Sequence, residues 1–219
     1  MRTRDFFVSA ASQVKFTPCV LAAIISVLCV ANAKASPVTY TETATVSGTL
    51  TISPTLIHIL TNDLLTLTGT GNTANVTNPV SGVFLNNVTA SFTVSSGGTV
   101  IESGTFTDPI EVFDSQVGSN PSVGFHDNAN SQDILDTFNA AFASYALSTS
   151  IGPITGSSFI ATGISFPTSA GALAFSSAGN ATFTATVSAV PLPAALPLFA
   201  TGLAGLGLLG WRRKKAAAG

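Results

Sequence analysis

The sequence predicts a mainly β domain over residues 36–189, folded as a two-sheet antiparallel sandwich, between two apolar terminal segments. Two observations predict this class: Thr, Val, Phe and Ile recur in short runs, and Gly, Asn, Ser and Pro interrupt these runs at short intervals. Residues of the first group favour strands and those of the second favour turns. Many short strands at such spacing are typical of a sandwich. An elongated β-solenoid is the alternative, although no fixed repeat period supports it.

The first 35 residues have the three regions of a secretory signal peptide. "MRTRDFFVSAASQVK" carries net positive charge, "VLAAIISVLCV" is apolar, and "ANAKA" supplies small residues at the spacing that signal peptidase requires. We therefore expect residues 1–35 to direct the chain to the Sec machinery and to be removed after Ala33 or Ala35. A retained membrane anchor is the alternative, but the apolar stretch is short for a span.

The predicted strands follow in order after this segment. "NPVSG" and "SSGGT" separate some of them as predicted turns. The predicted strands are "VTYTETATVSGTLTI", "LIHIL", "LLTLTGTG", "GVFLNNVTASFTVSS", "TVIESGTFTD" and "IEVFD", and later "SFIATGISF", "ALAFSSA" and "NATFTATVSAV".

One segment, "SQDILDTFNAAFASYAL", has the periodicity of a helix instead. Its apolar residues recur at three- and four-residue spacing, and Asn130 or Ser131 is available as an N-cap. Asp133 and Asp136 would lie near the positive end of the helix dipole. We therefore predict an amphipathic helix over residues 131–146 that packs an aromatic stripe against the sheets. The stripe consists of Ile134, Leu135, Phe138, Ala141, Phe142 and Tyr145.

The chain ends with "VPLPAALPLFATGLAGLGLLGWRRKK". The residues from Ala194 to Trp211 have Thr201 as their only polar side chain, and as a helix they span about 27 Å, close to the thickness of a bilayer core. Trp211 lies where an interfacial aromatic residue belongs. The positive-inside rule predicts that the basic cluster after it stays in the cytoplasm. This cluster is Arg212, Arg213, Lys214 and Lys215.

Two prolines precede this predicted transmembrane helix. Each fixes its own φ and disfavours the α region for the residue before it, so Val190 and Leu192 are expected to be extended. The segment therefore cannot join the helix, and it presents an extended backbone of the kind that a peptidase cleft accepts. The motif residues are Val190, Pro191, Leu192, Pro193 and Ala194.

The order of proline pair, Gly- and Leu-rich apolar helix and terminal Arg/Lys cluster resembles the PEP-CTERM sorting signal of Gram-negative bacteria. The match is to its VPLPA-type subclass, with Leu192 where the commoner signal has Glu. The resemblance covers residues 190–219. It implies that an exosortase, a membrane-embedded cysteine peptidase, releases or transfers the protein to the cell surface or into extracellular polysaccharide. It implies no chemistry for residues 36–189. A permanent single-pass anchor is the alternative.

Charge and cysteine content exclude several classes of function for residues 36–189. All Lys and Arg residues lie before Ser36 or after Trp211, whereas nine of the ten acids lie between these positions. A domain without basic side chains cannot neutralise phosphates, so we expect no nucleic-acid binding. Cys19 and Cys29 both fall in the predicted signal peptide, so the mature domain would contain no disulfide and no cysteine nucleophile.

Two histidines are the first candidates for chemistry. His58 lies among strand hydrophobes and is expected to be an ordinary strand residue, whereas His126 lies beside Asp127 in "HDNANSQD" and could act as a base or a ligand. This oxygen-rich loop could hold Ca²⁺. However, Ala129 and Ser131 stand where an EF-hand loop requires Asp or Asn. We therefore predict neither a metal site nor a cofactor.

Four acids gather in "ESGTFTDPIEVFD", and a glycosidase would need two of them to face a sugar-sized cleft. A GxSxG nucleophile elbow is absent from the sequence. We interpret the acids as surface groups that maintain solubility and discourage edge pairing, and we expect no catalytic residue. The four acids are Glu102, Asp108, Glu111 and Asp114.

Three functions are compatible with these features. The favoured one is a non-enzymatic cell-surface or extracellular-matrix protein, associated with extracellular polysaccharide or biofilm, which passes the inner membrane in transit. The first alternative is a carbohydrate-binding or adhesin-like module that uses loop Asn and Asp residues with or without calcium. The second is a secreted hydrolase, which would require His126 to lie in a cleft against two of the clustered acids.

Overall fold

The computed structural model describes residues 35–189 and Phe199. The predicted signal peptide up to Lys34 and the predicted transmembrane helix, Phe199 excepted, lie outside the described residues. Among the residues that are described, no helix is long and apolar enough to cross a membrane.

The described region is mainly β, as the sequence predicts. It contains two short 3₁₀ helices, η1 (Thr73–Asn75) and η2 (Ala140–Ser144). Its strands are β1 (Pro37–Ser53), β2 (Leu56–Asn72), β3 (Thr77–Val80), β4 (Val83–Ser96), β5 (Thr99–Thr105), β6 (Ile110–Ser115), β7 (Ser122–Asp127), β8 (Gln132–Phe138), β9 (Ile151–Ile160), β10 (Ser165–Thr168) and β11 (Gly171–Val187).

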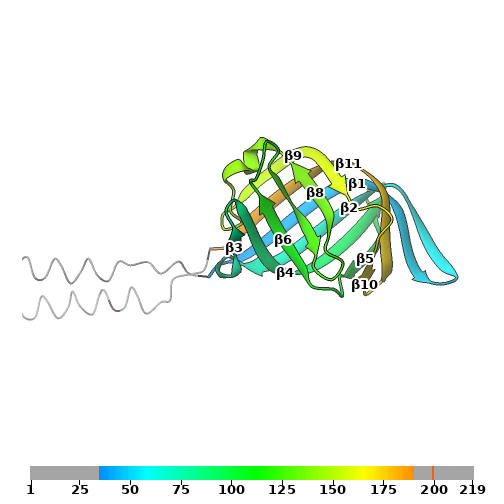
Figure 1. Cartoon of the computed structure of the whole chain (residues 1–219). Coiled ribbons are helices and arrows are strands. Elements are labelled where there is room, and N and C mark those ends of the chain that lie inside the picture. Colours follow the sequence, from blue (N-terminus) through cyan, green and yellow to red (C-terminus); the bar gives the residue numbers. More distant parts are fainter. Residues whose placement is uncertain (1–34, 190–198, 200–219) are drawn as a thin grey trace, which may run out of the picture. The chain divides into compact units, whose positions relative to one another are not determined.

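Eight of these strands form a closed antiparallel barrel (Figure 1), so the predicted two-sheet sandwich is wrong. The order is β1-β2-β4-β6-β7-β8-β9-β11, and β11 returns to pair with β1. This last pairing runs from Val38 opposite Val187 to Thr51 opposite Ala172. The alternation of apolar and polar residues within one strand shows which face is buried, but it does not show whether the first and last strands of the domain pair with each other.

The remaining strands, β3, β5 and β10, extend the barrel wall. β4 changes partners along its length: residues 83–88 pair with β6, and residues 91–96 pair with β5. β11 likewise pairs with β10 at its start and with β9 further on. The predicted turn in "SSGGT" is confirmed, because Gly97 and Gly98 connect β4 to β5 with positive φ values that glycine adopts without steric penalty.

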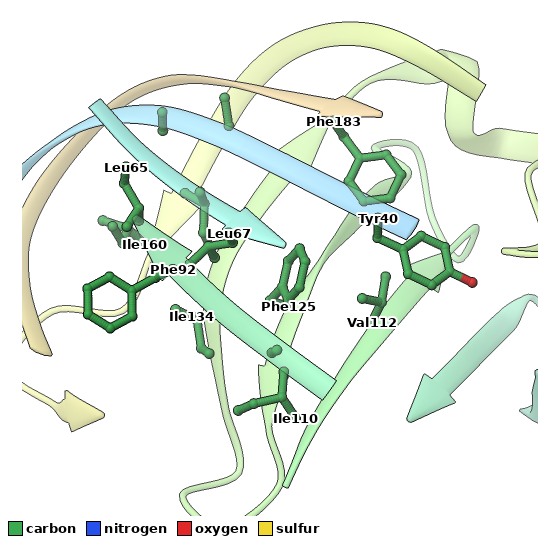
Figure 2. Packing of buried hydrophobic residues seen from close by; sticks show 14 of the residues in the cluster. Tyr40, Leu65, Leu67, Phe92, Ile110, Val112, Phe125, Ile134, Ile160 and Phe183 are labelled. Carbon is green, nitrogen blue, oxygen red and sulfur yellow. The ribbon is translucent and has the colours of Figure 1, made fainter. Parts of the chain in front are cut away.

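The barrel interior is filled with apolar side chains. Alternate residues of β1, beginning at Val38 and Tyr40, point inward and are buried. Figure 2 shows Phe92 of β4, Phe125 of β7 and Phe183 of β11 in the same apolar cluster as Tyr40. Each fully buried aromatic side chain of this kind contributes about 1.5–3 kcal/mol of transfer free energy.

The predicted amphipathic helix over residues 131–146 is wrong. These residues form β8 and then η2, with Asn139 as the cap of η2 in place of Asn130 or Ser131. The register of β7 and β8 shifts beside Leu135, which leaves Ile134 as an extra residue, and both side chains are buried. Consecutive buried residues at a bulge produced the spacing that resembles a helix face. Phe142 and Tyr145 are in the core, as predicted for the aromatic stripe, but Ala141 is exposed.

The hairpin of β1 and β2 extends beyond the barrel wall (Figure 1). Each strand is 17 residues long, but β2 pairs with β4 only from Leu64 to Thr70. We call residues 48–60, the far part of this hairpin, the arm. The opposite end of the barrel holds both ends of the domain, where the Ser188 N–H donates to the Pro37 carbonyl at 2.9 Å.

Candidate functional site

The predicted sorting and cleavage residues fall almost entirely outside the described residues. This applies to the motif from Val190 to Ala194, to the basic cluster from Arg212 to Lys215, and to Ala33. Ala35 is described, and it is exposed two residues before β1 begins. A cut after Ala33 or Ala35 would therefore leave every strand of the barrel intact.

The two histidines lie in different parts of the barrel, and each contacts an acid. His58 is in the arm and forms an ion pair or hydrogen bond with Glu102 of β5. His126 is in β7, and its Nδ1 lies 2.7 Å from Asp133 Oδ1 in β8. The sequence placed His126 beside Asp127, but neighbouring residues of a strand point to opposite faces, so Asp133 is its partner.

The "HDNANSQD" segment is the hairpin that joins β7 to β8. The carboxylate of Asp127 accepts the N–H groups of Ala129 at 2.9 Å and Asn130 at 3.3 Å, and it also accepts the Asn130 side-chain amide at 2.7 Å. Asp127 is buried, and its oxygens close the turn. Across residues 35–189, no three His, Cys, Asp or Glu side chains form a group that could hold a metal ion.

The four acids that cluster in the sequence do not cluster in space. Glu102 contacts His58, Asp114 is buried inside the barrel, and Glu111 lies on the outer face of β6 opposite His126. Asp108 precedes β6 in a connecting segment. Of these four acids, only Glu111 is thus a register partner of His126, whereas a carboxylate-pair hydrolase would need two of the four facing one cleft.

Buried polar groups join η2 and the segment after it to the barrel. The Tyr40 hydroxyl donates to the Leu147 carbonyl at 2.6 Å. The Gln116 amide donates to Asp114 Oδ2 at 2.8 Å and to the Tyr145 carbonyl at 2.9 Å. Burial raises the pKa of Asp114 to about 7, although the Gln116 hydrogen bond opposes this shift. These contacts hold Tyr145 and Leu147, which follow η2, against β1 and the end of β6.

Glu42 is a second buried carboxyl inside the barrel. Thr137 Oγ1 donates to its Oε1 at 2.6 Å, whereas Oε2 has no partner. Burial raises the pKa of Glu42 well above its ordinary value, and the nearby charge of Asp136 raises it further. Burial therefore favours the neutral form of Glu42, which avoids the penalty of burying a charge.

A mixed polar and aromatic surface lies on the outside of β6, β7 and β8. Because Val112, Leu135 and Thr137 face inward, their strand neighbours Phe113 and Asp136 face outward. Two rows of register partners cross these strands. We call the two rows together the outer face: one is Asn87, Glu111, His126 and Asp133, and the other is Leu85, Phe113, Gly124, Asp136 and Phe159.

Asp136 is the most unusual residue of the outer face, because it is only 4% exposed. Its Oδ1 lies against Gly124, where a Cβ would collide with it, and this oxygen has no hydrogen-bond partner. Burial raises the pKa of Asp136 to about 8, and the charge of Asp133 adds to the shift. The carboxyl is therefore mostly protonated at neutral pH and carries an O–H donor.

Sequence reasoning missed Asp133 and Asp136 as members of a surface, because it placed both in a helix. The signal that could have found them is the "DNANS" turn, which is rich in hairpin residues and stands between His126 and Asp133. A hairpin there brings these two side chains together across the strands. Chemically, the outer face offers carboxylates, an amide, an imidazole and the ring of Phe159, which is 45% exposed.

No protein-family model, curated protein or solved structure matches this chain. The function proposed below therefore depends on the residues of the chain itself.

Proposed function

We propose that the chain is an exported cell-surface or extracellular-matrix protein, sorted by an exosortase-type peptidase, whose barrel is a non-enzymatic module associated with extracellular polysaccharide. The observation that carries this proposal is the order of features in the sequence: a signal peptide, a Lys- and Arg-free domain, and then "VPLPA", an apolar span and "RRKK". Each terminal segment assigns the same orientation independently, with the domain outside the membrane and the basic tail inside.

The geometry of the barrel supports delivery as a separable module. β1 and β11 are neighbours, and Val38 lies opposite Val187 at the end where the domain starts and stops. Processing at both ends would therefore remove no strand and expose no core residue. Measured along β1, at most about 55 Å of strand separates this end from the tip of the arm at 3.3 Å per residue. A chain held in the membrane by its C-terminal segment would present the arm far from its attachment.

The composition of the barrel also suits an extracellular location. Residues 36–189 contain no cysteine, so folding does not depend on the redox state of the compartment. The core instead rests on aromatic packing, such as the contact of Phe142 with Phe183 at 5.9 Å between ring centroids. Such a module can fold after export without an oxidising enzyme.

The sorting proposal is tested by replacing Pro191 and Pro193 with alanine in the full-length chain. Alanine releases the φ restraint, so the segment can join the following helix and lose its extended backbone. We expect the double variant to remain in the membrane fraction at full length, whereas the unaltered protein is released. Pro197→Ala, which changes a proline outside the motif, is the matched control and should be released normally. Normal release of the double variant would contradict the proposal.

A second candidate function, carbohydrate binding, is favoured by one observation: Phe159 is exposed on the outer face, next to Asp136 and in the row beside Asp133. Exposed apolar rings and hydrogen-bonding groups on one face suit a polyhydroxylated ligand. Because Asp127 is used to close its turn, we expect binding to persist in the presence of a chelator.

Co-sedimentation with polysaccharide from the native host tests this second function. Phe159→Ala should weaken binding, while Val100→Ala, which removes an exposed apolar side chain from β5, should leave it unchanged. Equal binding by the two variants would exclude the outer face as the site. Loss of binding on chelation would instead indicate a metal-dependent route.

A further inference from the structure

We propose that the edge of β2 in the arm pairs antiparallel with the same edge of a second copy of this chain, so that two barrels share a continuous sheet about a two-fold axis. The inference goes beyond the proposed function and does not depend on export or sorting. It rests on the open edge of β2, its sequence symmetry, its exposed apolar residues and the absence of opposing charge.

The edge of β2 is open in the arm. Residues 56–60 pair with β1 on one side, from Ser53 to Gly48. On the other side, β4 begins to pair only at Leu64, beyond a bulge at Thr61 and Asn62, whereas the β1 side of the arm stays joined to β11 up to Thr51. Within the described part of the chain, no strand covers this side of residues 56–60. Its backbone N–H and C=O groups are therefore a template for another strand.

The sequence of this edge is self-complementary for antiparallel pairing. Residues 56–60 read Leu-Ile-His-Ile-Leu, the same in both directions. When two copies pair about His58, each Leu56 lies opposite Leu60 of the other copy, and each Ile57 lies opposite Ile59. Every apolar residue then meets a residue of similar size and shape, which is the arrangement that stabilises cross-strand pairs. A two-fold interface requires such self-complementarity.

Two of the side chains that this pairing would bring together, Ile57 and Ile59, are exposed in the single chain. Ile57 is 52% exposed and Ile59 is 76% exposed, and both lie on the same face of the arm, opposite Thr51 and Thr49 of β1. Pairing of two arms places four isoleucines next to one another on this face. Isolated exposed apolar residues are common, but two successive ones on an unpaired strand edge mark a site of association.

Other outer strands carry features that oppose pairing, and residues 56–60 of the arm do not. Pro79 in β3 and Pro167 in β10 lack the N–H that a ladder needs, and β5 carries Glu102. Residues 56–60 contain no proline, no lysine and no acid, and Pro54 of the arm lies in the turn before β2. The barrel as a whole is acidic, so an edge without carboxylates is where two copies can approach with least repulsion.

The contact of His58 with Glu102 leaves this edge accessible. His58 is opposite Leu50 in the β1–β2 register, and Leu50 is buried, so His58 lies on the inward face of the arm. Glu102 therefore reaches His58 across a face of the sheet, while the backbone edge of β2 stays free.

Disulfide trapping of the full-length chain, purified in detergent, tests the proposed register. With Cys19→Ala and Cys29→Ala as background, His58→Cys should form a covalent dimer on oxidation, because directly opposed residues of an antiparallel pair have Cα atoms about 4.5–5.5 Å apart. Ile57→Cys alone should form little dimer, whereas mixing Ile57→Cys with Ile59→Cys chains should form it readily. Val80 of β3 is 64% exposed, so Val80→Cys is the matched control.

Sedimentation velocity gives a second, independent readout. We expect the unaltered chain to be dimeric and Ile59→Lys to be monomeric with an unchanged circular dichroism spectrum, while Val80→Lys remains dimeric. Ile59 is already exposed, so the lysine does not threaten the fold. Three results would each overturn the proposal: a monomeric unaltered chain, equal behaviour of the two lysine variants, or trapping of Val80→Cys as efficient as that of His58→Cys. None of these results bears on release by the Pro191 and Pro193 variant, so the two proposals can fail separately.

Discussion

Replacement of Asp136 by asparagine should make the barrel more stable at alkaline pH than the unaltered protein. The side chain is 4% exposed, lies against Gly124, and has one oxygen without a partner. Burial disfavours the charged carboxylate and raises its pKa from 3.8 to about 8. Asparagine has the same shape and is never charged, so it removes the penalty of ionisation with little change in packing.

The sign and size of the effect follow from proton linkage. The folded protein keeps the Asp136 proton up to about pH 8, whereas the unfolded chain releases it near pH 4. The stability that this carboxyl contributes is therefore complete below about pH 4, falls as the pH rises, and is lost above about pH 8. Four pKa units correspond to on the order of 5 kcal/mol, which is comparable to the whole stability of a typical domain.

Urea unfolding of the full-length chain in detergent, followed by far-ultraviolet circular dichroism at pH 4.5 and at pH 8, measures this effect. We expect Asp136→Asn to match the unaltered protein at the lower pH and to exceed it by several kcal/mol at the higher one. Asp108→Asn removes the same formal charge from a connecting segment and controls for long-range repulsion. Equal pH dependence of Asp136→Asn and the unaltered protein would refute the reasoning.

Three further predictions concern the interior and the wall of the barrel. Gly124→Ala would place a Cβ against the backbone carbonyl oxygen of Leu135 and against Asp136 Oδ1, and it should lower the free energy of unfolding by about 1–3 kcal/mol. Gly179→Ala, with its nearest atom at 3.7 Å, should change it little in a thermal melt. Tyr40→Phe leaves the Leu147 carbonyl without its donor and should lower the free energy of unfolding in urea by about 1–3 kcal/mol. Glu42→Gln removes a buried ionisable group whose pKa is raised, so the loss of stability with rising pH should be smaller than in the unaltered protein; an unchanged pH profile would contradict this reading.

The strands could be predicted from the sequence where buried residues alternate with more exposed ones, and less well where several buried residues follow one another. β1 alternates between buried and half-buried residues, and "VTYTETATVSGTLTI" shows this directly. In β8, Ile134, Leu135, Asp136 and Thr137 are all buried in succession, so the two-residue period disappears. Local pattern alone then favoured a helix, although tertiary contacts make the segment a strand.

Closure of the barrel could not be predicted, because it depends on contacts between the two ends of the domain. Nothing in the residues around Val38 specifies that Val187 will lie beside it. The outer face was hidden for the same reason, since its two rows come from five strands. In contrast, the palindrome at residues 56–60 is visible in the sequence, and only the structure places it on an open edge.

Intact mass spectrometry of the protein recovered from the native host tests the central claim most directly. The account predicts an extracellular or surface-associated chain that begins at Lys34 or Ser36 and lacks the basic cluster from Arg212 to Lys215. Recovery of the complete chain of 22.1 kDa from the cytosol, with both terminal segments still attached, would contradict it.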